Sequence, residues 1–143
     1  MGRHMGIDVG TVRVGVAFSD PGGRIASAHS TLEVESWEST AEALADLAEE
    51  RDVDCAVFGW PVRMDRSEGR SVEMVDACID GFGTACDNRG LSVAIERWDE
   101  RLTSTEAESV LIDADLTREK RRGAVDRVAA TRILQSYLDA RSG

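Results

Sequence analysis

Short apolar runs separated by turn residues dominate the first third of the chain. They cover residues 5–9, 13–19 and about 24–34, and their length and composition predict three strands. Gly10 ends the first run, and Pro21, Gly22 and Gly23 form a tight turn after the second. Because connections this short join antiparallel neighbours, we expect these strands to form a meander.

From Ser36 onward, the apolar residues recur with the period of a helix. Leu44, Leu47 and Ala48 share one face, which predicts a helix that ends near Arg51. The apolar run 53–59 then predicts a buried parallel strand, residues 72–87 a second helix and residues 91–98 a fifth strand.

The last third of the chain carries more charge. Thr103 and Glu106 fit a capping box, which predicts a third helix that extends to about residue 112. Residues 113–122 alternate in charge and contain few apolar side chains, so they are expected to form a mobile loop. A final helix is predicted over about 123–140.

The resulting order, β-β-β-α-β-α-β-α-α, predicts an α/β fold. Three meandering strands followed by strand-helix crossovers give a mixed five-stranded sheet flanked by helices. The sequence contains no internal repeat and no linker, so residues 1–143 are expected to form a single domain. The opening residues MGRHM carry no part of this interpretation.

The net charge of −10 argues against a polyanionic partner until the distribution of charge is considered. Of 17 basic residues, six lie between positions 118 and 132: Arg118, Lys120, Arg121, Arg122, Arg127 and Arg132. An acidic surface with one basic patch is compatible with nucleic-acid binding that is sensitive to salt.

Cysteine use and hydropathy bear on the compartment. The three cysteines lack CxxC spacing, which favours reduced thiols in a cytoplasmic protein over disulfides or a zinc site. No apolar run reaches the length of a membrane span and no signal peptide is recognisable, so no membrane association is expected.

Three acidic positions are predicted to converge. Asp8 lies on the first strand, which should be central, and Asp99 and Glu100 follow the fifth strand at the same edge of the sheet. Asp126 lies on the apolar stripe of the last helix, and its small neighbours let that helix approach the sheet. Clustered carboxylates repel one another unless a cation compensates them, and Mg²⁺ or Mn²⁺ suits such ligands best.

Each acid also has a purely structural interpretation, in which a neighbour compensates its charge. These neighbours are the Gly10 or Thr11 amide for Asp8, Arg97 or Arg101 for Asp99 and Glu100, and Arg122 or Arg127 for Asp126. A shared metal site requires all three structural interpretations to fail together.

Four blocks of sequence resemble the YqgF family, also called RuvX, of ribonuclease H-like proteins. They are GIDVGTVRVGVAFSD at 6–20, VFGWPVRMDRSEG at 57–69, DERLTSTEAE at 99–108 and KRRGAVDRVAATRILQSYL at 120–138. The resemblance implies a ribonuclease H-like fold and a metal-dependent nuclease, with Asp8, Glu100 and Asp126 at the family's catalytic, metal-binding positions. It also implies processing of the 5′ end of pre-16S rRNA in ribosome biogenesis, Holliday junction resolution, or both.

The sequence departs from the family pattern in three places. Trp60 stands where the family usually has leucine, and Asp65-Arg66 replaces the usual Asp-Gly, so this loop is expected to contact substrate differently. The last helix carries one acid where the resolvase RuvC has two, which leaves occupancy of a second metal position open.

The mechanism expected from these residues needs no nucleophilic side chain. Two Mg²⁺ ions bridged by Asp8 would activate water and stabilise the leaving oxygen of a phosphodiester. Arg13 and Arg101 are expected to hold phosphates, and the segment with Arg118, Lys120, Arg121 and Arg122 to clamp the nucleic-acid backbone. The alternative for this segment is a solvated charge run.

Two other functions stay open at this point. The chain could be a non-catalytic nucleic-acid-binding module, or DVGTVRVGVA could be the phosphate loop of an actin-like ATPase fragment. The expected partner is nucleic acid, either precursor rRNA or branched DNA. Symmetric cleavage of a junction would require a homodimer, with Trp37, Trp60 and Trp98 as candidate interface residues.

Overall fold

A computed structural model describes residues 3–60, 72–99 and 118–142, with the side chains of 118–127 and 142 left out of the description. The described elements follow the order β1 (Arg3–Val9), β2 (Arg13–Ser19), β3 (Ala26–Glu33), α1 (Trp37–Glu50), β4 (Val53–Trp60), α2 (Val72–Asn88), β5 (Ala94–Asp99) and α4 (Arg118–Ser142). The strands form one sheet in the order β3-β2-β1-β4-β5. This arrangement confirms the predicted mixed five-stranded sheet with the first strand at its centre.

The sheet is antiparallel on one side of β1 and parallel on the other. β1 pairs antiparallel with β2, and β2 pairs antiparallel with β3. β4 runs parallel to both β1 and β5, so the carboxyl ends of these three strands meet at one edge. We call it the carboxyl edge.

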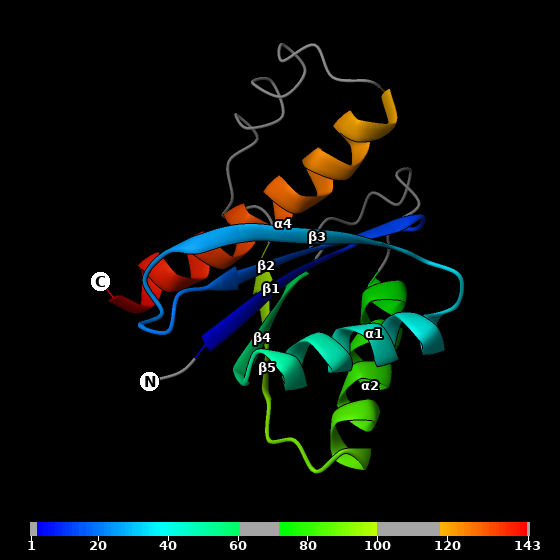
Figure 1. Cartoon of the computed structure of the whole chain (residues 1–143), viewed down its shortest axis with the longest axis horizontal. Coiled ribbons are helices and arrows are strands. Elements are labelled where there is room, and N and C mark those ends of the chain that lie inside the picture. The colour runs from blue at the N-terminus through cyan, green and yellow to red at the C-terminus, as the bar shows by residue number, and fades with distance from the viewer. Residues whose placement is uncertain (1–2, 61–71, 100–117, 143) are drawn as a thin grey trace.

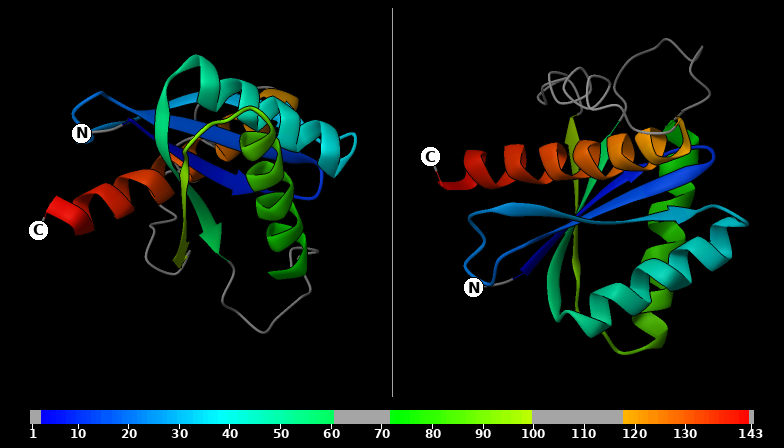
Figure 2. Two further views of the ribbon diagram at one scale, coloured as in Figure 1. Left: turned by 90° about the horizontal axis from the view of Figure 1, so that it is seen from below. Right: turned by 45° about the horizontal axis from the view of Figure 1, so that its top comes forward.

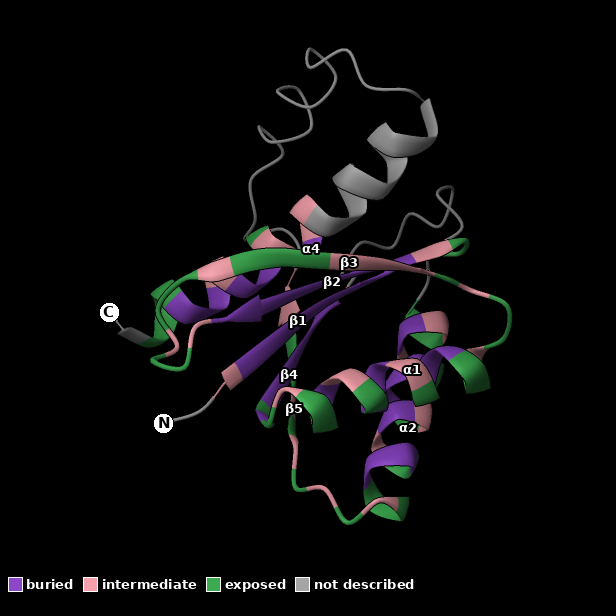
Figure 3. Cartoon of the chain, viewed as in Figure 1, coloured by how far each residue is buried: buried purple, intermediate pink, exposed green. Residues whose placement is uncertain are grey.

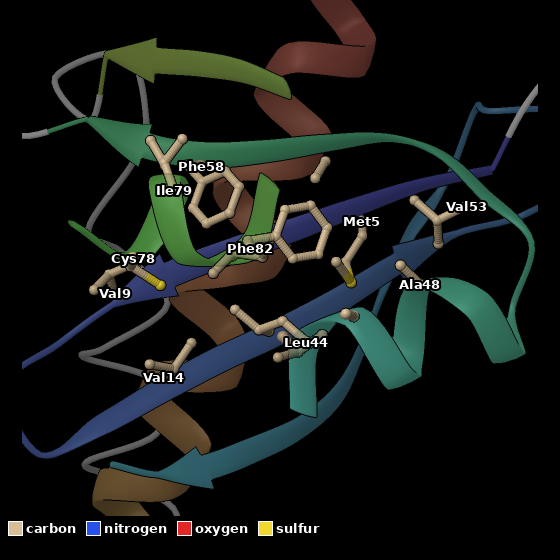
Figure 4. Packing of buried hydrophobic residues seen from close by; sticks show 14 of the residues in the cluster. Met5, Val9, Val14, Leu44, Ala48, Val53, Phe58, Cys78, Ile79 and Phe82 are labelled. Atoms are coloured by element: carbon tan, nitrogen blue, oxygen red, sulfur yellow. The ribbon is translucent and has the colours of Figure 1, made fainter. Parts of the chain in front are cut away.

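Helices cover both faces of the sheet, with α1 and α2 on one side and α4 on the other (Figures 1 and 2). Side chains that alternate along the strands divide into two clusters accordingly. Met5, Ile7, Val9, Val14 and Phe58 belong to the cluster on the α1/α2 face (Figure 4). Ala17, Cys55 and Val57 pack with Ala130 and Leu134 on the α4 face. Figure 3 shows β1 and β2 buried over most of their length between these layers.

Gly6 lets α4 lie close to the central strand. A Cβ at this position would lie 2.6 Å from Leu134 Cβ and 2.8 Å from the Ala130 carbonyl oxygen, too close for any side chain. The absence of a side chain at Gly6 therefore sets the depth at which α4 packs on β1.

A charged contact joins the two helices of the other layer. Arg89 pairs with Glu42 and Asp46 at 2.6 Å each and with Glu49 at 3.1 Å. Hydrogen bonds to Glu42, Asp46 and Glu49 raise the pKa of the Arg89 guanidinium above its usual value. Arg89, directly after α2, therefore fastens that helix end to α1.

Two predicted strand boundaries need correction. β1 begins at Arg3, so the opening residues set aside above include part of the central strand. β5 begins at Ala94 and not at Leu91, because the pairing with β4 starts at Cys55 and Ala94. The helix predicted for 103–112 lies outside the described residues.

The predicted mobile loop was wrong at its C-terminal end. Residues 118–122 belong to α4, which begins at Arg118. Arginine, glutamate and lysine all have high helix propensity, and the packed C-terminal half of α4 supports extension of the helix through them.

Two further expectations concern cysteines and membranes. Cys55, Cys78 and Cys86 are all free and buried, as expected for reduced thiols. Among the described helices, none is long and apolar enough to cross a membrane.

Candidate active site

Asp8 is a buried carboxylate on the central strand, with 9% of its surface exposed. Its neighbours Ile7 and Val9 face α1 and α2, so alternation along β1 directs Asp8 to the α4 face. It lies one residue before the end of β1, at the carboxyl edge. The structure therefore places a charge-bearing group where ligand sites of open α/β sheets usually form.

Glycines flank Asp8 on both neighbouring strands. Gly15 on β2 lies directly opposite Asp8. On β4, Gly59 follows Phe58, the register partner of Ile7, and so flanks Asp8 from the other side. Val14 and Phe58 belong to the α1/α2 cluster, so both glycines lie on the α4 face with Asp8. The position directly beside Asp8 on each adjacent strand therefore carries no side chain.

These two glycines were not among the predicted site residues. The signal that could have identified them is a glycine inside a strand pattern, which often marks the close approach of a ligand or of another backbone.

The turn after Asp8 is closed by its own backbone. The Gly10 amide donates a hydrogen bond to the Arg13 carbonyl at 3.0 Å. A Cβ at Gly10 would lie 2.6 Å from that same carbonyl oxygen, so only glycine fits here. The Gly10 amide is therefore used within the turn, against the interpretation in which it compensates the charge of Asp8.

Arg13 shares the face of Asp8. It precedes Gly15 by two residues on β2, and Gly15 pairs with Asp8, so Arg13 is its diagonal neighbour. Diagonal positions in antiparallel strands lie about 7–8 Å apart, within reach of a long side chain. The structure thus brings together Asp8 and one of the two arginines predicted to hold phosphates.

Asp99 lies at the carboxyl edge, but on the opposite face of the sheet from Asp8. It is the last residue of β5 and pairs with Trp60. Trp98 packs against the α4-face cluster, whereas Ile95 packs against the α1/α2 cluster. Alternation therefore puts Asp99 on the face opposite Asp8. The expectation that the two acids share an edge is confirmed, but they do not share a face.

The Arg97 side chain, suggested above as a partner of Asp99 or Glu100, makes other contacts. Its guanidinium lies 3.2 Å from Asp76 of α2 and stacks over the Trp60 ring, 5.0 Å from the ring centroid.

Of the three acids carried into the metal-site hypothesis, only the side chain of Asp8 is described. Glu100 and Arg101 lie outside the described residues. Asp126 lies in α4 together with Arg118, Lys120, Arg121 and Arg122, and the side chains of all five are outside the description. Within the described residues, no three His, Cys, Asp or Glu side chains come together to hold a metal ion.

An aromatic cluster fixes α4 against the strands that carry the site. Trp98 donates a hydrogen bond from Nε1 to Ser136 Oγ at 2.9 Å and contacts the Tyr137 ring edge-on. Tyr137 also packs on His4, whose Nε2 lies 2.7 Å from Arg141. Burial raises the pKa of the Tyr137 hydroxyl and of the neighbouring Cys55 thiol, so both stay neutral near pH 7.

The three tryptophans suggested for a dimer interface are all half-buried within the chain. Trp37 and Trp60 pack against the α1/α2 cluster, and Trp98 against the α4-face cluster. Their apolar character is thus accounted for by packing within one chain, and the homodimer stays a prediction.

Sequence comparison decides the family. A family model described as RuvX, Holliday junction resolvase, matches residues 2–140. The chain belongs to the RuvX family. A relative from Syntrophomonas wolfei, named as a pre-16S rRNA nuclease, is 39% identical over 98% of this chain and 96% of its own length. A Syntrophus aciditrophicus relative of the same name is 41% identical over 96% of this chain and 89% of its own.

Solved structures of low sequence identity share the fold. Thermus thermophilus RuvC in complex with a Holliday junction substrate aligns with a TM-score of 0.63 at 12% identity, over 100% of this chain and 97% of that one. The yeast mitochondrial Holliday junction resolvase Ydc2 aligns with a TM-score of 0.57 at 13% identity, over 99% and 79% of the two chains. The fold is the ribonuclease H-like fold of these resolvases.

Membership of RuvX resolves the choice of function class. This RuvX chain is a nuclease, a hydrolase of phosphodiester bonds, and the turn after Asp8 belongs to a nuclease and not to an actin-like ATPase.

Proposed function

We propose that this RuvX chain is a divalent-metal-dependent endonuclease in which Asp8, Glu100 and Asp126 hold Mg²⁺ or Mn²⁺. The observation that carries the proposal is the placement of Asp8, a buried carboxylate at the carboxyl edge with Gly15 and Gly59 beside it. Because both positions directly beside Asp8 are glycines, they leave space next to its carboxylate oxygens. A hard divalent cation, which takes carboxylate and water ligands, fits such a space. The described part of the site therefore fits the metal.

The arrangement of β5 supports Glu100 over Asp99. Asp99 lies on the face opposite Asp8, which removes it as a shared ligand. Glu100 is the next residue in the sequence, and successive strand residues alternate between faces. On this argument Glu100 is the acid from the end of β5 that completes the site.

Helical spacing supports Asp126. It precedes Ala130 by four residues in α4, which is about one helical turn. The Ala130 carbonyl lies against Gly6, and Gly6 precedes Asp8 by two residues on the same face of β1. The turn of α4 that contains Asp126 is thus the one that continues from Gly6 toward Asp8.

Divalent ions bound by such carboxylates supply charge stabilisation and an activated water for phosphodiester hydrolysis. The protein residues position the metal ligand and the substrate phosphate. Asp8 is fixed by pairing on both sides of its strand, and Arg13 offers a guanidinium on the same face for a substrate phosphate. The buried Asp8 side chain needs no reorganisation before substrate binds.

Charge polarity indicates the side from which nucleic acid approaches. α1 and α2 carry five and four acidic residues and no basic residue, whereas the sequence of α4 carries seven basic and three acidic residues. Because phosphate contacts dominate the affinity for nucleic acids, the substrate docks on the α4 side. Arg118, Lys120, Arg121 and Arg122 are the proposed backbone contacts, and Arg101 is a further proposed phosphate contact.

The proposed substrate is the 5′ precursor region of 16S rRNA. The names of relatives about 40% identical over nearly the whole chain support it. A four-way DNA junction is the second candidate, because the family description names this activity. Resolution of a junction by paired cuts would also need two copies of the site, and hence a homodimer.

A comparative cleavage assay tests the proposal. Precursor 16S rRNA, a four-way DNA junction and single-stranded RNA are incubated with the protein in Mg²⁺, Mn²⁺ or EDTA. We expect cleavage of the precursor with either metal and none with EDTA. Preferred cleavage of the junction would replace the first substrate with the second. Cleavage in EDTA would contradict the metal site, and no cleavage of any substrate would contradict the nuclease itself.

A further inference from the structure

Trp98 lies in line with Asp8 across the sheet and on the same face. Gly59 flanks Asp8 on β4, and Trp98 on β5 is the register partner of Gly59. Trp98 packs against the α4-face cluster, so its side chain lies on the face to which Asp8 is directed. Two strand spacings separate Asp8 from Trp98, which is about 10 Å. The position between them in this row is a glycine and carries no side chain.

Trp98 is only half-buried, because α4 lies mainly over β1, β2 and β3. Ala94 and Glu96, which share the face of Trp98 on β5, are both exposed. The α4 face of β5 is thus left open by the described helices. Part of the Trp98 side chain is accessible to a ligand, while the rest of its surface packs against the protein.

Contacts with α4 hold the Trp98 indole in place. Its Nε1 donates a hydrogen bond to Ser136 Oγ at 2.9 Å, and the Tyr137 ring lies perpendicular to it, with ring centroids 5.4 Å apart. A side chain that is already held in this way loses little conformational freedom when a ligand binds. Trp98 therefore offers a preorganised aromatic surface beside the site.

The side chains on the two sides of Asp8 differ in what they can bind. Arg13 on β2 is a diagonal neighbour of Asp8 and suits a phosphate. On β5 the same face carries Ala94, Glu96 and Trp98, and none of these is a cation. Glu96 would repel a phosphate above β5, whereas a base finds an aromatic ring on which to stack. This distribution favours the nucleic-acid backbone toward β2 and a base toward β5.

We propose that Trp98 stacks on an unpaired base of the substrate, within about three nucleotides of the scissile phosphate, since about 10 Å corresponds to three stacked steps of about 3.4 Å. The proposal rests on the nuclease function proposed above and adds a residue that determines the class of substrate. Bases that are unpaired and unstacked can lie against aromatic side chains, whereas the faces of a base inside a duplex are covered by its neighbours. Trp98 should therefore favour a single strand over a fully paired one.

The test compares wild type with Trp98→Leu, Trp98→Phe and Trp37→Leu. Trp98→Phe keeps an aromatic ring at the proposed contact. Trp37→Leu is the matched control, because Trp37 is also half-buried but packs against the α1/α2 cluster, on the face opposite Asp8. Once the cleavage site of the wild type has been mapped, an oligonucleotide that spans it is supplied single-stranded and annealed to its complement. kcat and KM are measured on both forms, below the melting temperature of every variant.

We expect the wild type to prefer the single strand. Trp98→Leu should raise KM for the single strand about five- to 150-fold, the scale of losing one stack between a base and an aromatic ring, and should leave KM for the duplex and both kcat values nearly unchanged. Trp98→Phe should retain most of the preference for the single strand, and Trp37→Leu should retain all of it. A purely structural role of Trp98 would instead weaken cleavage of both forms alike.

Two failures are distinguishable. If the wild type neither binds nor cleaves any nucleic acid, the nuclease proposal fails and this one with it. If the wild type cleaves its best substrate, three results refute the Trp98 contact alone: cleavage of neither form of the oligonucleotide, a loss by Trp98→Leu that is no greater on the single strand than on the duplex, or an equal loss of preference in Trp37→Leu.

Discussion

Asp8 on β1 lies directly opposite Gly15 on β2, so the buried carboxylate at the centre of the sheet has backbone and not a side chain as its cross-strand neighbour. Directly opposed positions in an antiparallel pair bring their Cβ atoms to about 5 Å, the closest cross-strand approach. Any side chain at position 15 would therefore stand beside the Asp8 oxygens.

This relationship makes Gly15→Ala informative. A methyl group there should displace Asp8 or its ligand, and the cleavage rate should fall by about 100-fold, the scale of a displacement of about 1 Å at a reacting centre. Initial rates under saturating metal measure the effect. Gly83→Ala in α2 is the matched control, because its Cβ would meet Ile95 Cδ1 at an ordinary 3.7 Å. Equal rates for both variants would mean that space beside Asp8 is not required.

Gly6→Ala should act on stability. Its Cβ would lie 2.6 Å from Leu134 Cβ and 2.8 Å from the Ala130 carbonyl, so α4 must move away from β1. Overpacking of this kind costs about 1–3 kcal/mol of unfolding free energy. Urea denaturation of Gly6→Ala and Gly83→Ala measures the difference. An undiminished stability of Gly6→Ala would show that α4 does not pack on β1 at this depth.

The ion pairs of Arg89, which join α1 and α2, predict a contribution to stability that depends on salt concentration. Arg89→Gln leaves Glu42, Asp46 and Glu49 close together without their shared cation. Since exposed charges are screened by salt, the variant should be less stable than wild type at low ionic strength, and the gap should narrow in about 1 M NaCl. Thermal melts at both salt concentrations give the comparison. An equal difference in melting temperature at both salt concentrations would mean that the variant loses packing and not charge pairing.

Asp20 predicts a dependence on acidity. Amides of Ile25 and Arg24 donate to its carboxylate at 2.8 Å and hold its pKa below the usual 3.8. A pKa lowered by folding contributes stability that is present above pH 3.8 and is lost as the pH falls through the folded-state value. Asp20→Asn keeps an acceptor oxygen without this titration. The stability advantage of wild type over Asp20→Asn, measured by urea denaturation, should therefore shrink between pH 5 and pH 2. A constant difference would contradict the assignment.

The elements that sequence patterns predicted best are those that end at strong local signals. β2 has the predicted bounds, because the Gly10 turn precedes it and Pro21 follows it closely. Ser36 caps α1 by accepting a hydrogen bond from the Ser39 amide at 3.0 Å, which matches the predicted start of that helix. Such signals lie within a few residues of the boundary that they set.

The features that sequence patterns did not predict depend on residues that are distant in the sequence and adjacent in the sheet. Leu91 and Val93 are apolar because they pack against the core, but they lie before the first residue of β5 that pairs with β4. The face of Asp99 follows from which cluster Ile95 and Trp98 join. Gly15 and Gly59 acquire meaning only when the register puts them beside Asp8. These facts belong to pairing across the sheet, which a local pattern does not encode.

Asp8→Asn gives the most direct measurement of the central claim, that a carboxylate at this position holds the metal required for cleavage. The substitution keeps the shape of the side chain and removes its charge, so the protein should fold and melt like the wild type. Cleavage of precursor 16S rRNA in Mg²⁺ or Mn²⁺ should fall to the level of wild type in EDTA. Cleavage by folded Asp8→Asn at the wild-type rate would contradict the claim.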